Sequence, residues 1–138
     1  KRIVFLAVLI ASILMLAACQ SEDDSDSITG VEWQWLSVKN QTTDVTVEVE
    51  FPENYTIIFN DDDTVEGKAD CNNFSGTYSQ DSGLTISLGP STMAFCGEAS
   101  LDQQYLALLS SVAAGGPDGS GGLALETAGG EQRMLFSE

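Results

Sequence analysis

The chain has 138 residues, of which 21 are acidic and five are basic, and its formal net charge at neutral pH is −16. Proteins bind nucleic-acid phosphates through lysine and arginine, so this balance excludes nucleic acid as an expected partner. The sequence also lacks histidine, the commonest general base and metal ligand near neutral pH. A GxSxG motif and a glycine-rich phosphate loop are absent as well. We therefore expect no catalytic residues, no metal and no cofactor.

The first nineteen residues have the layout of a bacterial export signal. A basic pair opens the chain, residues 3–18 are nearly all apolar, and small residues precede a cysteine. The tetrapeptide Leu16-Ala17-Ala18-Cys19 resembles the lipobox of bacterial lipoproteins, which implies cleavage before Cys19 and lipidation of its thiol. We predict a lipoprotein signal peptide over residues 1–18; the alternative is an uncleaved transmembrane anchor. Acyl chains on Cys19 would hold the mature protein on a membrane.

Residues 19–27 are predicted to be the lipidated cysteine and a tether. The eight residues after Cys19 are all polar and four of them are acidic, so they offer no apolar surface to bury. Loss of residues 1–18 would change the net charge from −16 to −18, because they hold two basic residues and no acidic one. Such a charge argues against lying flat on anionic lipid. We expect a protein of the cell envelope, outside the cytoplasm, that meets the membrane only through its lipid.

Residues 28–138 form about one domain and are mainly β in character. β-branched and aromatic residues, often in alternation, predict strands over residues 31–38, 44–51, 55–60, 64–70, 74–79, 83–88, 123–127 and 132–136. In the second of these, Val45, Val47, Val49 and Phe51 share one face and are expected to be buried. Short antiparallel strands at this spacing indicate a sandwich or a barrel, and a barrel would remove exposed edges.

One segment predicts a helix ahead of the final hairpin. Ser100 and Gln103 fit a capping box. The apolar residues that follow trace one helical stripe, formed by Leu101, Tyr105, Leu108, Leu109 and Val112. Residues 115–117, Gly-Gly-Pro, are expected to end the helix, and residues 115–122 to form a flexible loop. The predicted fold is thus a small antiparallel β-barrel-like domain of about eight strands with one α-helix before the final hairpin.

Two cysteines remain once Cys19 is assigned to a lipid. In an exported protein, Cys71 and Cys96 most often pair, and a disulfide closing a loop of this length contributes about 3 kcal/mol. Unpaired buried thiols are one alternative. A reactive thiol is another, with weak support from Lys68 near Cys71 and from the helix start near Cys96. A zinc site would need two further ligands of a kind that the sequence does not supply.

Two other groups could carry function. The run Asp61-Asp62-Asp63 could hold Ca²⁺, although it lacks the layout of an EF-hand loop; the other interpretation is a solvated turn. Trp33 and Trp35 share a strand face and could stack on a small ligand at a barrel end, or could simply belong to the core.

The residues around the two cysteines resemble a known family. The runs YTIIFNDDDTVEGKADCNNFSGTY and LTISLGPSTMAFCGEASLDQQYLALLSSV are similar to the META domain, the HslJ-like family, and the similarity covers residues 28–138. The matching positions, besides the two cysteines, are Trp33, Gly67, Asn72, Phe74, Gly76, Tyr78, Thr92, Asp102 and Tyr105. Asp63 departs from the family pattern, which has a turn glycine there, but aspartate tolerates positive φ. Asn72 and Asn73 are expected to suit a bend beside Cys71.

The resemblance implies a small antiparallel β-barrel-like domain with one helix, common in envelope lipoproteins and loosely tied to stress responses. It supplies no catalytic residue. We therefore expect a membrane-anchored, non-enzymatic envelope or stress-related module. The alternative is a small-ligand- or protein-binding barrel that uses the Trp33 and Trp35 end.

Overall fold

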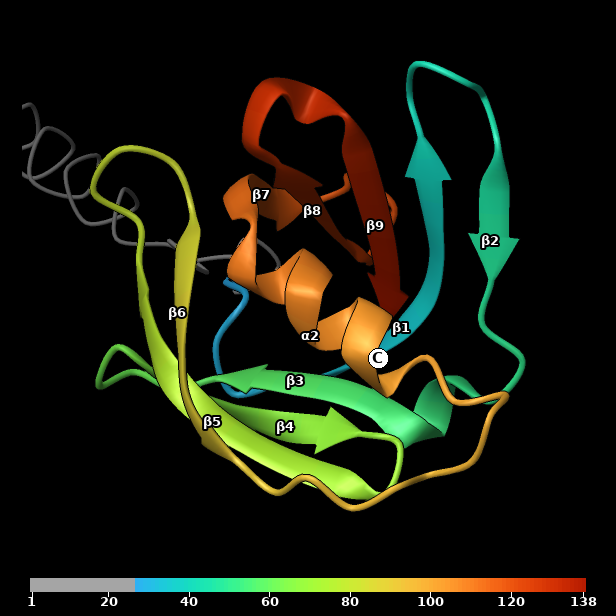
Figure 1. The fold of residues 1–138 in the computed structure, drawn as a ribbon. Helices are drawn as coiled ribbons and strands as arrows, with labels where there is room; N and C mark the ends of the chain where they lie inside the picture. Colours follow the sequence, from blue (N-terminus) through green and yellow to red (C-terminus); the bar gives the residue numbers. More distant parts are fainter. Residues whose placement is uncertain (1–26) are drawn as a thin grey trace, which may run out of the picture.

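The structure, a computed structural model, describes residues 27–138. The predicted signal peptide, Cys19 and nearly all of the predicted tether lie outside the described residues. Nine strands form one curled antiparallel sheet around a single α-helix in the described part of the chain (Figure 1). The elements are β1 Glu32–Asn40, β2 Thr46–Glu48, η2 Pro52–Asn54, β3 Tyr55–Phe59, β4 Thr64–Ala69, β5 Asn72–Ser79, β6 Thr85–Ser91, α2 Asp102–Ser110, β7 Val112–Pro117, β8 Leu123–Thr127, η3 Ala128–Gly130 and β9 Gln132–Ser137. The predicted mainly β fold with one helix before the final hairpin is confirmed.

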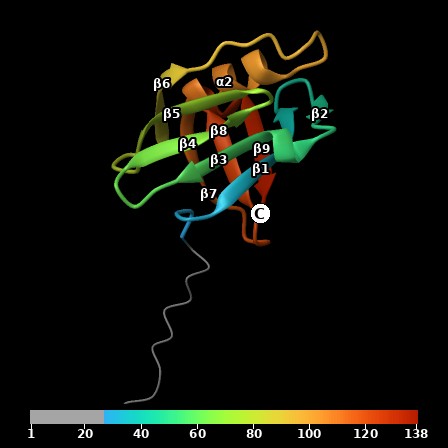
Figure 2. The same cartoon turned by 90° about the horizontal axis from the view of Figure 1, so that it is seen from below.

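The strand order makes the sheet a half-barrel. Its order is β6-β5-β4-β3-β1-β9-β8-β7, and β2 pairs with β1 beside this path. The sheet curls until its two end strands approach each other, and α2 lies in the hollow (Figures 1 and 2). At this approach Gly83 sits against the carbonyl oxygen of Ala113, where a Cβ atom would not fit. Curling lets the inner face of the sheet bury its apolar side chains against a single helix.

An aromatic cluster fills the space between α2 and the sheet. The ring of Tyr105 stacks on Trp35 with centroids 5.0 Å apart and meets Tyr55 edge-on at 5.7 Å. Trp33 and Trp35 are both buried, and their ring N–H groups donate to the carbonyl oxygens of Ile28 and Ser37, each at 2.9 Å. The tryptophan pair therefore belongs to the core.

The predicted helix was too long, and the chain after it forms a strand. Helix α2 ends at Ser110, and β7 pairs with β8 over residues that were expected to be helix and loop. Small residues permit this pairing, because a Cβ atom on Gly115 would overlap the side chain of Leu125. The predicted capping box is also wrong: Leu101 is the N-cap residue, and Ser100 Oγ accepts from the N–H of Asp102 at 3.2 Å rather than from that of Gln103.

The predicted flexible loop after β7 is organised by one aspartate. Asp118 Oδ1 accepts hydrogen bonds from the backbone N–H of Ser120 at 2.7 Å and of Gly122 at 2.9 Å. These bonds favour the charged carboxylate and lower the pKa of Asp118. The loop thus has a defined turn, although its glycine-rich composition indicated a flexible segment.

The predicted strand 44–51 was also wrong in extent and in burial. Only Thr46–Glu48 is a strand, and Val45 and Phe51 are 58% and 53% exposed. Of the four residues expected to be buried, only Val49 is. The reason is that β2 pairs with the C-terminal half of β1, at Ser37–Lys39, whereas β3 pairs with the N-terminal half. This hairpin projects beyond the core (Figure 1), so its apolar face has little to pack against.

Candidate functional site

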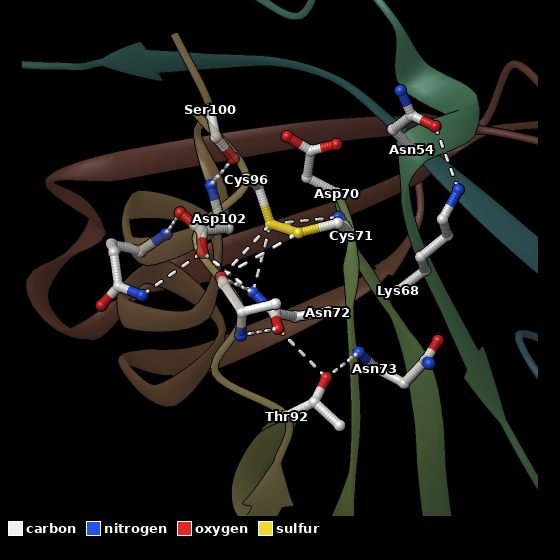
Figure 3. Close-up of a disulfide and its surroundings, with 12 residues drawn as sticks. Asn54, Lys68, Asp70, Cys71, Asn72, Asn73, Thr92, Cys96, Ser100 and Asp102 are labelled. Atoms are coloured by element: carbon white, nitrogen blue, oxygen red, sulfur yellow. Dashed lines mark hydrogen bonds between the residues drawn. A yellow bond between two sulfur atoms is a disulfide. The ribbon is translucent and has the colours of Figure 1, made fainter. Parts of the chain in front are cut away.

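A disulfide joins the turn after β4 to the segment that leads into α2. Cys71 and Cys96 are bonded with an S–S distance of 1.98 Å and Cα atoms 5.6 Å apart (Figure 3). This agrees with the predicted pairing and leaves no free thiol at either position. Cys71 is exposed and Cys96 is half-buried. The backbone N–H of Cys71 also donates to the sulfur of Cys96 at 3.3 Å.

Asn72 is the centre of the hydrogen bonding beside the disulfide. Its side chain, in a residue only 1% exposed, points from β5 toward the segment before α2 (Figure 3). Its amide oxygen accepts from the N–H of Ala94 at 2.7 Å, and its amide nitrogen donates to the carbonyl oxygen of Ala94 at 3.0 Å. The same nitrogen reaches the Asp102 carboxylate at 3.2 Å. Asn72 thus fixes the chain at Ala94 in the way that a neighbouring strand would.

Thr92 and Asp102 complete this arrangement from its two sides. The Thr92 hydroxyl donates to the amide oxygen of Asn72 at 3.1 Å and accepts from the N–H of Asn73 at 2.9 Å. Asp102, which is buried, accepts from the N–H of Gln103 at 2.8 Å and from the Asn72 amide. A carboxylate at the first residue of a helix is also favoured by the helix dipole. We call this set the clasp; its members are Cys71, Asn72, Thr92, Cys96 and Asp102.

The bend beside Cys71 is made by a residue that the sequence did not single out. Asp70 has a φ of 58° and takes the left-handed conformation, whereas Asn72 and Asn73 lie within β5. The expectation that the two asparagines form the bend was therefore wrong. Aspartate fits here because its short polar side chain tolerates that conformation. Asp63 does the same in the earlier turn, with a φ of 63°, so the departure from the turn glycine is accommodated as expected.

Tyr55 is a further contributor that the sequence analysis missed. Its hydroxyl accepts a hydrogen bond from the N–H of Leu101 at 2.9 Å, and donates a long one of 3.5 Å to Asp70. It therefore links the bend before the clasp to the start of α2. No sequence pattern indicates this contact, because an aromatic residue at the start of a strand is typical of a core position.

The remaining family-motif residues lie outside the clasp. Phe74 and Tyr105 pack together in the core, with ring centroids 6.2 Å apart. Gly67 and Gly76 sit where a Cβ atom would overlap a backbone carbonyl oxygen, of Thr56 and Ser87 respectively. The motif is therefore split between a polar clasp and packing positions.

Tyr78 marks another region, near the acidic turn. Its hydroxyl donates to the carbonyl oxygen of Asn60 at 3.0 Å. Burial, together with the charges of Asp61, Asp62 and Asp63, raises the pKa of Tyr78 above its ordinary value of 10.0. In this turn the Asp62 carboxylate accepts from the Thr64 hydroxyl and backbone N–H, which lowers the pKa of Asp62. Asp62 thus bonds within its own turn, as a solvated turn requires.

The described residues offer neither a cluster of metal ligands nor a helix that could span a membrane. Within residues 27–138, no group of three or more histidine, cysteine, aspartate or glutamate side chains is placed to hold a metal ion. In that range, too, no helix has the length and apolar character needed to cross a bilayer. What the clasp offers chemically is a fixed backbone, a disulfide and one carboxylate, that of Asp102, which is engaged with protein donors.

The disulfide should stabilise the domain only under oxidising conditions. Replacing Cys71 with alanine is expected to lower the free energy of unfolding by about 3 kcal/mol in oxidising buffer, and to make no difference once reductant has opened the bridge in the parent protein. Urea unfolding of both proteins in both buffers measures this. The Cys71→Ala/Cys96→Ala double variant controls for the thiol that the single variant leaves free. Equal losses with and without reductant would contradict a stabilising bridge.

Comparison with known proteins gives the family and the fold. The family model described as the META domain matches residues 26–138. Two solved structures are similar: a DUF4847 family protein from Bacteroides vulgatus ATCC 8482, with 12% identity and a TM-score of 0.62, and a protein from Burkholderia xenovorans, with 17% identity and a TM-score of 0.60. Each match covers 80% of this chain, and respectively 93% and 82% of the other chain. At these identities the likeness concerns the fold alone.

A search of the curated proteins finds no significant match. The family model nevertheless spans the whole described domain, including the cysteine-bearing runs on which the resemblance was based. The observed mainly β fold with one helix is also the fold that the resemblance implied. The chain therefore belongs to the META domain family.

Proposed function

We propose that the protein is a lipid-anchored component of the bacterial cell envelope, outside the cytoplasm, whose META domain serves as a non-enzymatic, stress-related module. The observation that carries this proposal is the disulfide between Cys71 and Cys96. Disulfides that are accessible to solvent persist in oxidising compartments and are reduced in the cytosol. The bridge is therefore compatible with the export signal and lipobox ending at Cys19.

A non-enzymatic role is supported by what the polar side chains of the clasp do. Asn72, Thr92 and Asp102 bond to one another and to nearby backbone groups. Groups engaged in this way hold a segment in place, whereas a general base must be able to reach the proton of a substrate. The sequence also offers no histidine for such a role.

The alternative of a ligand stacked on Trp33 and Trp35 receives no support. Both indoles are buried and their N–H groups are bonded to backbone oxygens. A ligand would have to displace core side chains to reach them. Protein binding stays open as a role for another surface of the domain.

The anchor is tested by determining the N-terminus of the protein made from the full chain in a bacterial host. We expect mass spectrometry to find Cys19 as the first residue, carrying a thioether-linked diacylglyceryl group, and the protein to fractionate with membranes. The Cys19→Ser variant should keep the disulfide fold but lack the lipid. Globomycin, which blocks lipoprotein signal peptidase, should cause the unprocessed form to accumulate. An unmodified Cys19 behind an intact residue 1–18 segment would overturn the anchor.

A further inference from the structure

Two exposed apolar side chains flank the residue that Asn72 holds. Met93 is 83% exposed and Phe95 is 84% exposed. Ala94 between them is bonded to the Asn72 amide through both its N–H and its carbonyl oxygen, and Cys96 after them is fixed by the disulfide. The backbone that carries Met93 and Phe95 is thus tied on both sides. The bonds of the clasp therefore keep the side chains of Met93 and Phe95 exposed to solvent.

Two hollows adjoin this tied segment. One, of about 420 Å³, is lined by Met93, Phe95 and Glu98 among others. The second, of about 210 Å³, has Phe51 in its wall, and Cys96 and Ser100 line both hollows. The two hollows are therefore neighbours on one surface. We call it the clasp surface; its apolar members are the exposed Phe51, Met93 and Phe95, and its acidic members are the exposed Glu50 and Glu98 and the half-buried Asp70.

Carboxylates line both hollows of this surface. Glu50 and Asp70 line the smaller hollow, and Glu98 lines the larger one. Lys68 reaches the rim, where its Nζ donates to Asn54 at 3.0 Å. The other two cations of the described residues are taken up elsewhere, Lys39 by Asp44 at 2.6 Å and Arg133 by Glu126 at 2.9 Å. The potential at the clasp surface is therefore set mainly by carboxylates.

We propose that the clasp surface docks a basic amphipathic segment of another protein. An apolar side chain of that segment would lie between Met93 and Phe95 or against Phe51, and its lysine or arginine residues would face Glu50, Asp70 and Glu98. Exposed apolar residues with a polar rim are typical of protein interaction sites, and complementary charge gives such sites their specificity. A surface that is already fixed loses little entropy when it binds. This proposal concerns the folded domain, so it does not depend on the lipid at Cys19.

A second copy of the chain and an anionic bilayer fit the negative charge of the clasp surface less well than a basic segment does. A second copy of the chain would bring the same carboxylates against these, and like charges across an interface oppose association. A bilayer rich in anionic lipid would repel them for the same reason. Cross-linking at position 95 distinguishes both from a basic segment.

The experiment uses the full chain, with its disulfide intact, held in phosphatidylcholine nanodiscs. A random dodecapeptide library displayed on phage is selected on these discs after depletion on empty ones. We expect the enriched peptides to combine lysine or arginine with aromatic or aliphatic residues, and to bind more weakly as salt is raised. Dissociation constants of the synthetic peptides are then measured for the parent protein and its variants.

Matched variants separate the clasp surface from the rest of the protein. Phe95→Ser is expected to raise the dissociation constant about tenfold, as the loss of a central apolar contact does. Val45→Ser, at another exposed apolar residue, should change it less than about twofold. Glu98→Lys should weaken binding and reduce its salt dependence, whereas Glu66→Lys, at an exposed position of β4, should not.

The occupant is identified independently by placing the photo-cross-linker p-benzoylphenylalanine at position 95 in the same nanodiscs. With the selected peptide present, the expected adduct has the mass of chain plus peptide. An adduct with a second copy or with phosphatidylcholine would overturn the proposal. So would the enrichment of only acidic or uncharged peptides, the absence of any enrichment, or binding that survives Phe95→Ser unchanged. None of these results bears on the lipid at Cys19, which is read from the mass of the N-terminus.

Discussion

Replacing Asn72 with leucine is expected to lower the free energy of unfolding by about 4 kcal/mol, because it removes one buried and three partly buried hydrogen bonds at once. Leucine has a similar size, so packing changes little while the hydrogen bonds disappear. The N–H and carbonyl oxygen of Ala94, the Thr92 hydroxyl and one oxygen of Asp102 each lose a partner. Each group that stays buried without a partner costs about 1–3 kcal/mol, and partial access of water to the segment reduces the total.

The neighbouring residue provides the control for this prediction. Asn73 is exposed, and its hydrogen bonds to Thr92 use only its backbone atoms. Asn73→Leu should therefore change the free energy of unfolding by less than about 0.5 kcal/mol. Urea unfolding at neutral pH in oxidising buffer measures both variants with the disulfide closed. If the two leucine variants lose the same stability, the hydrogen bonds of the Asn72 amide do not stabilise the fold as predicted.

Removing the whole ring of Tyr105 should lower the free energy of unfolding, whereas removing only its hydroxyl should raise it. Tyr105→Ala takes a ring out of the aromatic cluster and should lower the free energy of unfolding by about 4 kcal/mol, as other buried aromatic deletions do. Tyr105→Phe keeps the ring and removes a hydroxyl that is fully buried without a hydrogen-bond partner among the described protein groups. That change should raise the free energy of unfolding by about 1 kcal/mol.

The same hydroxyl predicts a dependence on pH. Burial raises the pKa of Tyr105 well above its ordinary value of 10.0, because the charged phenolate is poorly solvated in the core. The folded state thus keeps its proton where the unfolded chain releases it. The contribution of Tyr105 to stability is therefore complete below pH 10 and decreases as the pH rises from 10 toward the raised pKa. Because phenylalanine does not titrate, the gain in the free energy of unfolding from Tyr105→Phe should grow as the pH rises above 10.

Urea unfolding at neutral pH and just above pH 10 checks both parts of this prediction for the three proteins. The alanine variant controls for the ring and the phenylalanine variant for the hydroxyl alone. A loss of stability in Tyr105→Phe at neutral pH would mean that the hydroxyl has a partner, such as a buried water molecule, that offsets its burial.

Much of the sheet followed from local sequence patterns. The strands around Tyr55–Phe59, Thr64–Ala69 and Leu123–Thr127 lie close to where alternation and β-branched residues placed them. Their patterns were reliable because each strand has a partner on both sides and a core beneath it, so the local preference and the tertiary environment agree. The pairing of Cys71 with Cys96 was predicted on other grounds, namely the number of cysteines and the expected oxidising compartment.

The errors occurred where pairing or coverage by distant residues decided the outcome. Val112–Pro117 is a strand because β8 is available beside it, although its glycines and proline indicated a helix end. Conversely, the alternation around Val45 indicated a buried face, but the hairpin projects past the core that would bury it. A local pattern encodes which side chains could be buried together; it does not encode whether another element covers them.

The sequence by itself determined the class of the fold, the disulfide partners, the helical stripe that carries Tyr105 and the strong acidity of the domain. Only the tertiary structure decided the role of Asn72, which was predicted to make a bend and instead fastens Ala94 and Asp102 across the clasp. It also decided that Met93 and Phe95 are exposed to solvent while Trp33 and Trp35 are buried. The physical reason is that hydrogen-bond partners and burial are properties of residues far apart in the chain, and they are set only when the curled sheet brings those residues together.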